Sequence, residues 1–74
     1  MIKELDIVAL AKPVPEHNLV PGDVGTVVMV HEDGAGYTVE FMTFTGETIA
    51  VATLDADAVR PLGGREVAHV REVV

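Results

Sequence analysis

The sequence predicts an all-β fold, a small five-stranded barrel followed by a C-terminal extension. Segments rich in Val and Thr recur along the chain, and Gly-containing turns separate them. In residues 37–42 apolar and polar side chains alternate, as in a strand that buries one face. The 74 residues are the length of a single domain.

Each element of the barrel has its own local signal. Strands are expected where Val, Ile and Thr concentrate, and loops where Pro, Gly, Asn and Asp cluster. A single 3-10 turn is expected where Asp55 stands in the position of an N-cap residue. In chain order the expected elements are a strand over 5–10, a long irregular loop over 11–23, a strand over 24–31, a hairpin turn over 32–36, a strand over 37–42, a turn over 43–46, a strand over 47–54, the 3-10 turn over 55–59 and a short last strand over 59–62.

The extension, residues 63–74, has an ambiguous pattern. Four valines among its last ten residues favour an extra strand, which could pair with the barrel edge or with a second chain. Val67, Val70 and Val74 also share one face of a helix, and a disordered tail is the third alternative. The strands over 5–10 and 24–31 are apolar on both faces, so we expect the tail or a partner to cover the second face.

The charge balance disfavours nucleic acid as a partner. Twelve Asp and Glu oppose five Lys and Arg, and ten of the acids lie in residues 1–62. Such a surface repels phosphate backbones, whose binding requires clustered Lys and Arg. Because the chain has no 18-residue apolar run and no signal-like start, we expect a cytoplasmic protein without a membrane span.

The chain offers little for catalysis. It contains no Ser and no Cys, the two commonest nucleophiles. Its histidines, His17, His31 and His69, lack the close spacing of a local metal-binding motif. Asp55 and Asp57 are explained by the turn in which they stand. We therefore expect no enzymatic activity, no metal site and no cofactor.

The stretch "LVPGDVGTVV" (19–28) is the most specific local signal. Pro21 and Gly22 are the central pair that a type II turn prefers, and the Asp23 side chain can close that turn. Gly25 is expected at a bulge or at a close approach of another backbone. These four residues are expected to be structural.

Several segments in fixed order resemble a small bacterial family known as domain of unknown function 4926. They are "LDIVAL", "PEHNLVPGDVGTVV", "GYTVEF" and "GETIAVATLDADAVRPL", and together they cover residues 5–62. The resemblance implies an SH3-like barrel, related in architecture to KOW domains and to the C-terminal barrel of the nitrile hydratase β subunit. It implies no activity, cofactor or catalytic residue, and residues 63–74 lie outside it.

The expected function is that of a non-enzymatic protein-interaction module, which binds a protein partner or self-associates through apolar strand faces and the 12–23 loop. This loop occupies the place where SH3-like barrels contact ligands, and the hairpin tip at 32–36 is the second candidate surface. The alternatives are a KOW-like nucleic-acid or ribosome-associated module and an accessory barrel of a nitrile-hydratase-like enzyme. The candidate binding residues are Pro15, Glu16, His17, Asn18, Asp33 and Tyr37.

Overall fold

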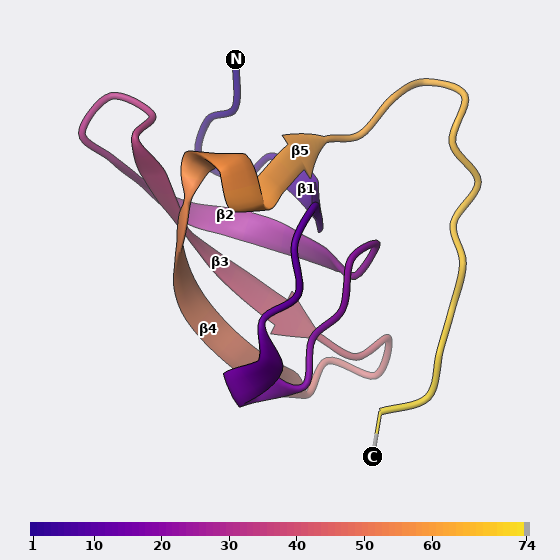
Figure 1. The fold of residues 1–74 in the computed structure, drawn as a ribbon. Coiled ribbons are helices and arrows are strands. Elements are labelled where there is room, and N and C mark those ends of the chain that lie inside the picture. The colour runs from indigo at the N-terminus through magenta and orange to yellow at the C-terminus, as the bar shows by residue number, and fades with distance from the viewer. Residues whose placement is uncertain (74) are drawn as a thin grey trace.

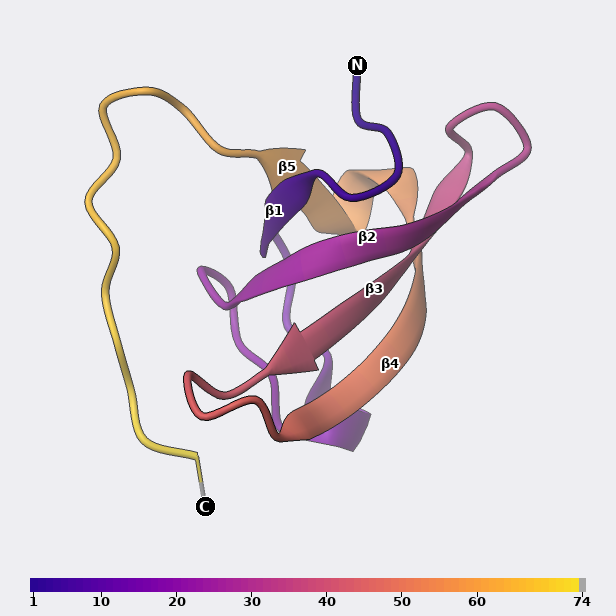
Figure 2. The same cartoon turned by 180° about the vertical axis from the view of Figure 1, so that it is seen from behind.

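The structure, a computed structural model, describes residues 1–73 and contains five antiparallel strands in one sheet (Figure 1). The order across the sheet is β4-β3-β2-β1-β5, and the sheet curves strongly (Figure 2). The elements are β1 (Ile7–Leu10), the 3-10 turn η1 (Pro15–His17), β2 (Val24–His31), β3 (Gly36–Met42), β4 (Thr48–Asp55), the 3-10 turn η2 (Ala56–Ala58) and β5 (Val59–Pro61).

The strand connections agree with the predicted all-β, five-stranded, SH3-like class. Tight hairpins join β2 to β3 and β3 to β4, the long loop joins β1 to β2, and η2 joins β4 to β5. β1 pairs with both β2 and β5. Among residues 1–73 no ladder joins β4 to β5, so hydrogen bonds do not close the sheet into a complete barrel.

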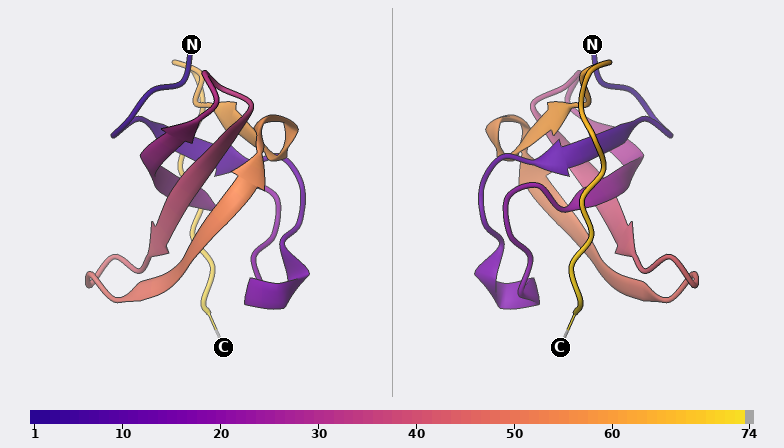
Figure 3. Two further views of the ribbon diagram at one scale, coloured as in Figure 1. Left: turned by 90° about the vertical axis from the view of Figure 1, so that its left-hand side faces the viewer. Right: turned by 90° about the vertical axis from the view of Figure 1, so that its right-hand side faces the viewer.

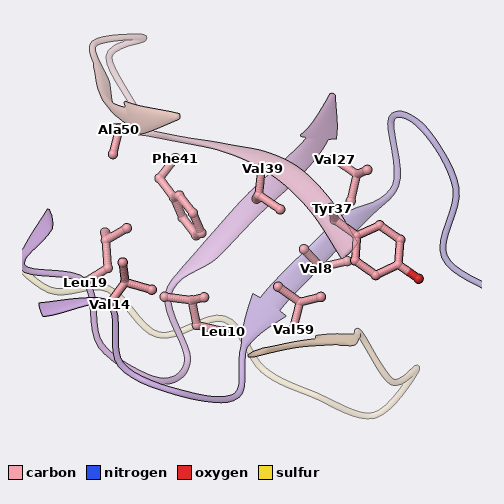
Figure 4. Close-up of a cluster of buried hydrophobic side chains, with 10 residues drawn as sticks. All are labelled: Val8, Leu10, Val14, Leu19, Val27, Tyr37, Val39, Phe41, Ala50 and Val59. Atoms are coloured by element: carbon pink, nitrogen blue, oxygen red, sulfur yellow. The ribbon is translucent and has the colours of Figure 1, made fainter. Parts of the chain in front are cut away.

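The concave side of the sheet holds one hydrophobic core (Figure 4). Its members come from every strand and from both sides of η1, which explains why the long loop packs against the sheet. Burying such aliphatic and aromatic side chains is the main force that stabilises a domain of this size. The core residues are Val8, Leu10, Val14, Leu19, Val27, Tyr37, Val39, Phe41, Ala50 and Val59.

The predicted boundaries agree closely with the structure except at the start of the chain. The strand over 24–31 is β2, and η2 lies within the predicted 3-10 turn, although Asp55 makes no side-chain capping bond there. The first strand begins at Ile7 and not at Leu5, because residues 3–6 form a turn. In that turn the Asp6 N–H donates to the Lys3 carbonyl at 3.1 Å.

The turn over 3–6 and the turn over 20–23 are equivalent, one before β1 and one before β2. In the second, the Asp23 N–H donates to the Val20 carbonyl at 3.1 Å. In each, the Asp side chain accepts the N–H of the first turn residue, at 3.0 Å for Asp6 and 2.9 Å for Asp23. Each turn also donates an N–H to the opposite strand, from Leu5 to the Val27 carbonyl and from Gly22 to the Leu10 carbonyl.

The third residue of both turns has a positive φ, +72° at Leu5 and +95° at Gly22. This conformation is the one that a type II turn requires, and it costs an L-residue about 1–2 kcal/mol. Leu5 is 77% exposed, so little burial offsets that cost.

Exchanging the residue types at these two equivalent positions is expected to have opposite effects. Leu5→Gly should raise the free energy of unfolding by about 0.5–1 kcal/mol, because relief of strain exceeds the added entropy of the unfolded chain. Gly22→Ala should lower it by about 1 kcal/mol, and only through the backbone, since a Cβ at Gly22 would meet nothing within 4 Å. Urea titrations of both variants followed by circular dichroism measure the two shifts, and shifts of the same sign would contradict this assignment.

The predicted extra strand in the extension is wrong for residues 63–73, and position 74 lies outside the described residues. Apart from a turn at 64–65, this segment has no regular secondary structure. It runs extended along one side of the molecule, away from a sheet edge (Figure 1, Figure 3), and residues 66–73 make no backbone–backbone hydrogen bond. Side-chain ion pairs, and not backbone pairing with a strand, hold this segment against the molecule.

The outer face of the sheet mixes polar and apolar residues, and its apolar side chains Ile7, Val24, Met29 and Val51 are 49–54% exposed. One row across it reads Ile7, Thr26, Glu40, Val51, so polar residues separate its apolar ends. Beside it, His31 Nε2 lies 2.6 Å from Thr38 Oγ1, which lies 3.0 Å from Thr53 Oγ1. The tail does not bury Val67 or Val70 against this face, since these side chains are 92% and 65% exposed.

Candidate functional site

The loop over 11–23 is pinned at its base and exposed at its tip. Val14 and Leu19 exchange two backbone hydrogen bonds, of 2.9 and 3.1 Å, and both side chains enter the core. Between them η1 carries Pro15, Glu16 and His17, all exposed. The loop therefore presents these side chains on a fixed support.

Asn18 ends η1 in the left-handed conformation, with φ +57°. Asparagine tolerates this conformation better than most residues, which accounts for its presence at this position. Its backbone carbonyl accepts a hydrogen bond of 3.0 Å from Arg71 Nη2 in the tail.

The Asp23 carboxylate forms a bidentate ion pair with the same guanidinium group of Arg71. Arg71 Nε donates to Asp23 Oδ1 at 2.8 Å, and Arg71 Nη2 donates to Asp23 Oδ2 at 2.6 Å. The Asp23 side chain is 16% exposed, and the Val20 N–H already fixes its Oδ2. Beside the pair lies a shallow hollow of about 320 Å³ lined by Val20, Pro21, Gly22, Asp23, His69 and Arg71.

Contacts with arginine side chains lower the pKa of the Asp23 and Glu66 carboxyl groups. The hydrogen bond from Arg71 is the largest cause of the lowered pKa of Asp23. The hydrogen bond from Arg60, followed by that from the Gly63 N–H, lowers the pKa of Glu66 to about 2. The Arg60–Glu66 contact, with Nη2 to Oε1 at 2.7 Å, fixes the start of the tail, as the Arg71–Asp23 contact fixes its far end.

The docking of the tail is expected to depend on pH with a defined sign. Contact with Arg71 lowers the pKa of Asp23, so the contact contributes stability above the ordinary carboxyl pKa of about 3.9 and loses it as the pH falls through the lowered value. The Arg71 Nε–H resonance should therefore change below about pH 4 and not between pH 5 and 7. An Asp23→Asn variant should lack the acid transition, and a transition that persists in it would contradict the assignment.

The structure separates the predicted binding residues into two groups. Pro15, Glu16, His17 and Asn18 lie at one end of the molecule, with η1. Asp33 lies in the β2–β3 turn at the opposite end, as Figure 3 shows for the two segments.

Tyr37 is not a surface contact residue, contrary to the prediction. Only 6% of it is exposed, because β3 directs its ring into the core (Figure 4). Alternation along β3 predicted that Tyr37 and Phe41 share a face, and that face is the buried one.

The β2–β3 turn is left-handed at three consecutive residues, Glu32, Asp33 and Gly34, with φ of +48°, +57° and +105°. The glycine was expected to take this conformation, whereas the two acids adopt it as well. Next to the turn a shallow hollow of about 410 Å³ is lined by Met1, Ile2, Lys3, Val30, Asp33 and Gly34.

The structural residues of "LVPGDVGTVV" lie as expected. Val20–Asp23 form the turn described above, and Asp23 closes it through its side chain. Gly25 faces β3 so closely that a Cβ would lie 2.6 Å from Val39 Cγ1. The bulge itself lies further along β2, between Val27 and Met29.

Phe44 is the most exposed aromatic residue of the chain, and sequence reasoning did not select it. It stands in the β3–β4 turn and is 93% exposed. The signal was present in "TFTG", because an aromatic residue inside a four-residue turn cannot reach the core. Arg71 was also missed, since no local pattern links it to Asp23, 48 residues earlier.

No group of three His, Asp or Glu side chains placed to hold a metal ion occurs within residues 1–73, and His17, His31 and His69 lie in three different segments. Both helical segments found in this part of the chain are single 3-10 turns, far shorter than a bilayer-spanning helix.

The fold and this surface define a small all-β, SH3-like domain with an extended C-terminal tail. The family model described as "Domain of unknown function (DUF4926)" matches residues 4–61, and the chain belongs to this family. No curated protein matches the chain. No solved structure matches it either. The match ends at β5, so Asp23 lies inside the family domain and Arg71 outside it.

Proposed function

We propose that this domain is a non-enzymatic protein-interaction module, which binds a protein partner or a second copy of itself. The observation that carries the proposal is Phe44, an aromatic side chain that is almost fully exposed on an ordered turn. Aromatic residues contribute more than most to interface energies, and a soluble domain has no structural need for one in this position.

Hydrogen bonds hold the turn around Phe44 in one shape. The Thr43 N–H donates to the Glu47 carbonyl at 2.8 Å, and the Gly46 N–H donates to the Thr43 carbonyl at 3.0 Å. The Glu47 N–H also donates to Thr43 Oγ1 at 3.0 Å. Because the backbone is fixed before binding, the turn loses little backbone conformational entropy on contact with a partner.

The Phe44 turn and η1 lie at the same end of the molecule, on its opposite sides (Figure 3). Half-exposed Met42 adds apolar surface beside the turn, and the exposed Glu16 adds negative charge at η1. Apolar anchors together with polar and acidic groups at a distance from them are the composition of a protein interface with a dry centre and a polar rim. The proposal therefore places the interaction at this end, with the 12–23 loop included.

We do not propose nucleic-acid binding, although the 19–28 stretch resembles KOW segments. Lys12 is the only lysine of the long loop, and its Nζ is bound at 2.7 Å by Asp57. The loop's carboxylates repel phosphates, and phosphate contacts dominate such binding. The role of an accessory barrel beside a hydratase-like enzyme would be one form of protein interaction, and the test below would identify such a partner.

Photo-crosslinking from position 44 tests the proposal. The full chain carries benzoylphenylalanine in place of Phe44, and a matched chain carries it in place of Glu4, an exposed residue of the 3–6 turn. We expect a discrete adduct from position 44, with the mass of one partner or of two chains, and none from position 4. The same adducts from both positions, or none from position 44, would contradict the proposal.

A further inference from the structure

We propose that the Asp23 carboxylate and the Asn18 carbonyl form a binding site for an arginine in an extended segment of a partner protein, and that the chain's own tail occupies this site in the partner's absence. The inference rests on the proposed function for the partner being a protein. It adds the chemistry that the partner must present.

The domain, and not the tail, positions the Asp23 carboxylate and the Asn18 carbonyl. The Val14–Leu19 pairing fixes the end of η1, and the left-handed φ of Asn18 directs the chain there. The type II turn fixes Asp23, whose Oδ2 accepts the Val20 N–H. All of these residues lie within the stretch that matches the family, and Arg71 does not.

The geometry of the site favours a guanidinium group. Two carboxylate oxygens receive Nε and Nη2 of Arg71, and Nη2 also reaches the Asn18 carbonyl. A planar group with several fixed N–H donors satisfies three acceptors at once, whereas an ammonium donates from a single atom. The third acceptor distinguishes this site from an ordinary surface ion pair.

The Asp23 turn differs from the equivalent turn closed by Asp6. Asp6 closes the turn over 3–6 in the same way that Asp23 closes the turn over 20–23. Capping a turn therefore does not require an arginine. What sets the Asp23 turn apart is the Asn18 carbonyl beside its carboxylate, which accepts from the same guanidinium.

Few contacts hold the tail, so a partner segment can replace it in the site. Residues 66–73 have no backbone–backbone hydrogen bond, and Val67 and Val70 are 92% and 65% exposed. The turn at 64–65 and the Arg60–Glu66 ion pair keep the tail close to the domain, so the high local concentration of Arg71 favours its contact with Asp23. A partner segment with more contacts would displace it.

The charge of the domain favours the same kind of occupant. The formal charge of the chain is −7, and the tail is neutral, so the deficit lies in the domain that carries the site. A basic extended segment is attracted to this surface from a distance.

The test uses the full chain with Arg71→Ala, which empties the site, and the capped peptide Glu-Val-Ala-His-Val-Arg-Glu-Val, the sequence of residues 66–73, as the probe. Amide resonances of Val20, Gly22 and Asp23 are followed as the peptide is added. We expect saturable shifts in the millimolar range, and affinity at least about fivefold weaker for a peptide with Lys in place of Arg. The wild-type chain should bind the peptide several-fold more weakly, because its own Arg71 competes.

The controls exploit the two equivalent turns. Asp23→Asn added to Arg71→Ala should abolish peptide binding, whereas Asp6→Asn in the same background should leave it unchanged. Equal binding by the Asp23→Asn chain, or equal binding of the Lys peptide, would overturn the proposal. Dimerisation of the wild-type chain that Arg71→Ala removes would also overturn it, because the site would then hold the tail of a second copy.

The two proposals fail separately. A position-44 adduct without arginine-dependent peptide binding removes the arginine site and retains the interaction module. Peptide binding that depends on Asp23, without any adduct from position 44, retains the arginine site and removes Phe44 as the anchor.

Discussion

Phe41→Ala is expected to destabilise the domain by about 3–5 kcal/mol, the usual loss when a buried aromatic ring is removed. Phe41 is 3% exposed, and its ring lies among core side chains from β3, β4 and the long loop (Figure 4). A domain of this length has a free energy of unfolding of only about 5 kcal/mol. The substitution should therefore unfold most of the chain, and urea titration followed by circular dichroism measures this loss.

Phe44→Ala is the matched control, since it removes the same ring from an exposed turn. Because Phe44 is 93% exposed, its replacement should change the free energy of unfolding by no more than about 0.5 kcal/mol. If Phe41→Ala does not fold, Phe41→Leu keeps most of the volume and should cost about 1 kcal/mol. A large loss for Phe44→Ala would show that its ring is packed, and the proposed function would lose the observation that carries it.

The strands were predictable because their signals are local. β2 was predicted at its observed bounds, since turn residues flank a segment rich in β-branched residues. The face that β3 buries followed from alternation, and it is the one that carries Val39 and Phe41. In a two-residue period, the choice of face is settled once the apolar set is known.

Other features depended on interactions that sequence patterns do not contain. Leu5 was placed in the strand over 5–10, yet the hydrogen bonds between Lys3 and Asp6 hold it in a turn, where its φ is positive. The tail was predicted to form a strand because it contains four valines. A strand needs a free edge within reach, and side-chain ion pairs instead hold the tail along the molecule.

The candidate site was predicted in part. The long loop was selected for its prolines and polar residues, and Asn18 and the adjoining Asp23 do receive an arginine there. The arginine itself lies far along the chain, so only the folded structure brings it to the loop. Tyr37 was included among the candidate binding residues, but the strand that carries it turns the ring inward.

Gly25→Ala is expected to lower the free energy of unfolding by about 2–3 kcal/mol, an unusually large effect for one methyl group. A Cβ at Gly25 would lie 2.6 Å from Val39 Cγ1, and 2.9 Å from both the Glu40 carbonyl oxygen and Phe41 Cδ1. The φ of Gly25 is not positive, so the loss is steric and not conformational. Gly64→Ala is the control, because nothing lies within 4 Å of its Cβ position and the change should be close to neutral.

A double-mutant cycle with Val39→Ala separates this contact from general disruption of the sheet. Val39→Ala alone should cost about 2 kcal/mol, because Val39 is fully buried. In the double variant the two methyl groups of Val39 are gone, so the new Cβ at Gly25 has room on that side. The combined loss measured by urea titration should therefore be smaller than the sum of the single losses by about 1 kcal/mol. Additive losses would mean that the carbonyl of Glu40, and not the Val39 side chain, is what keeps position 25 a glycine.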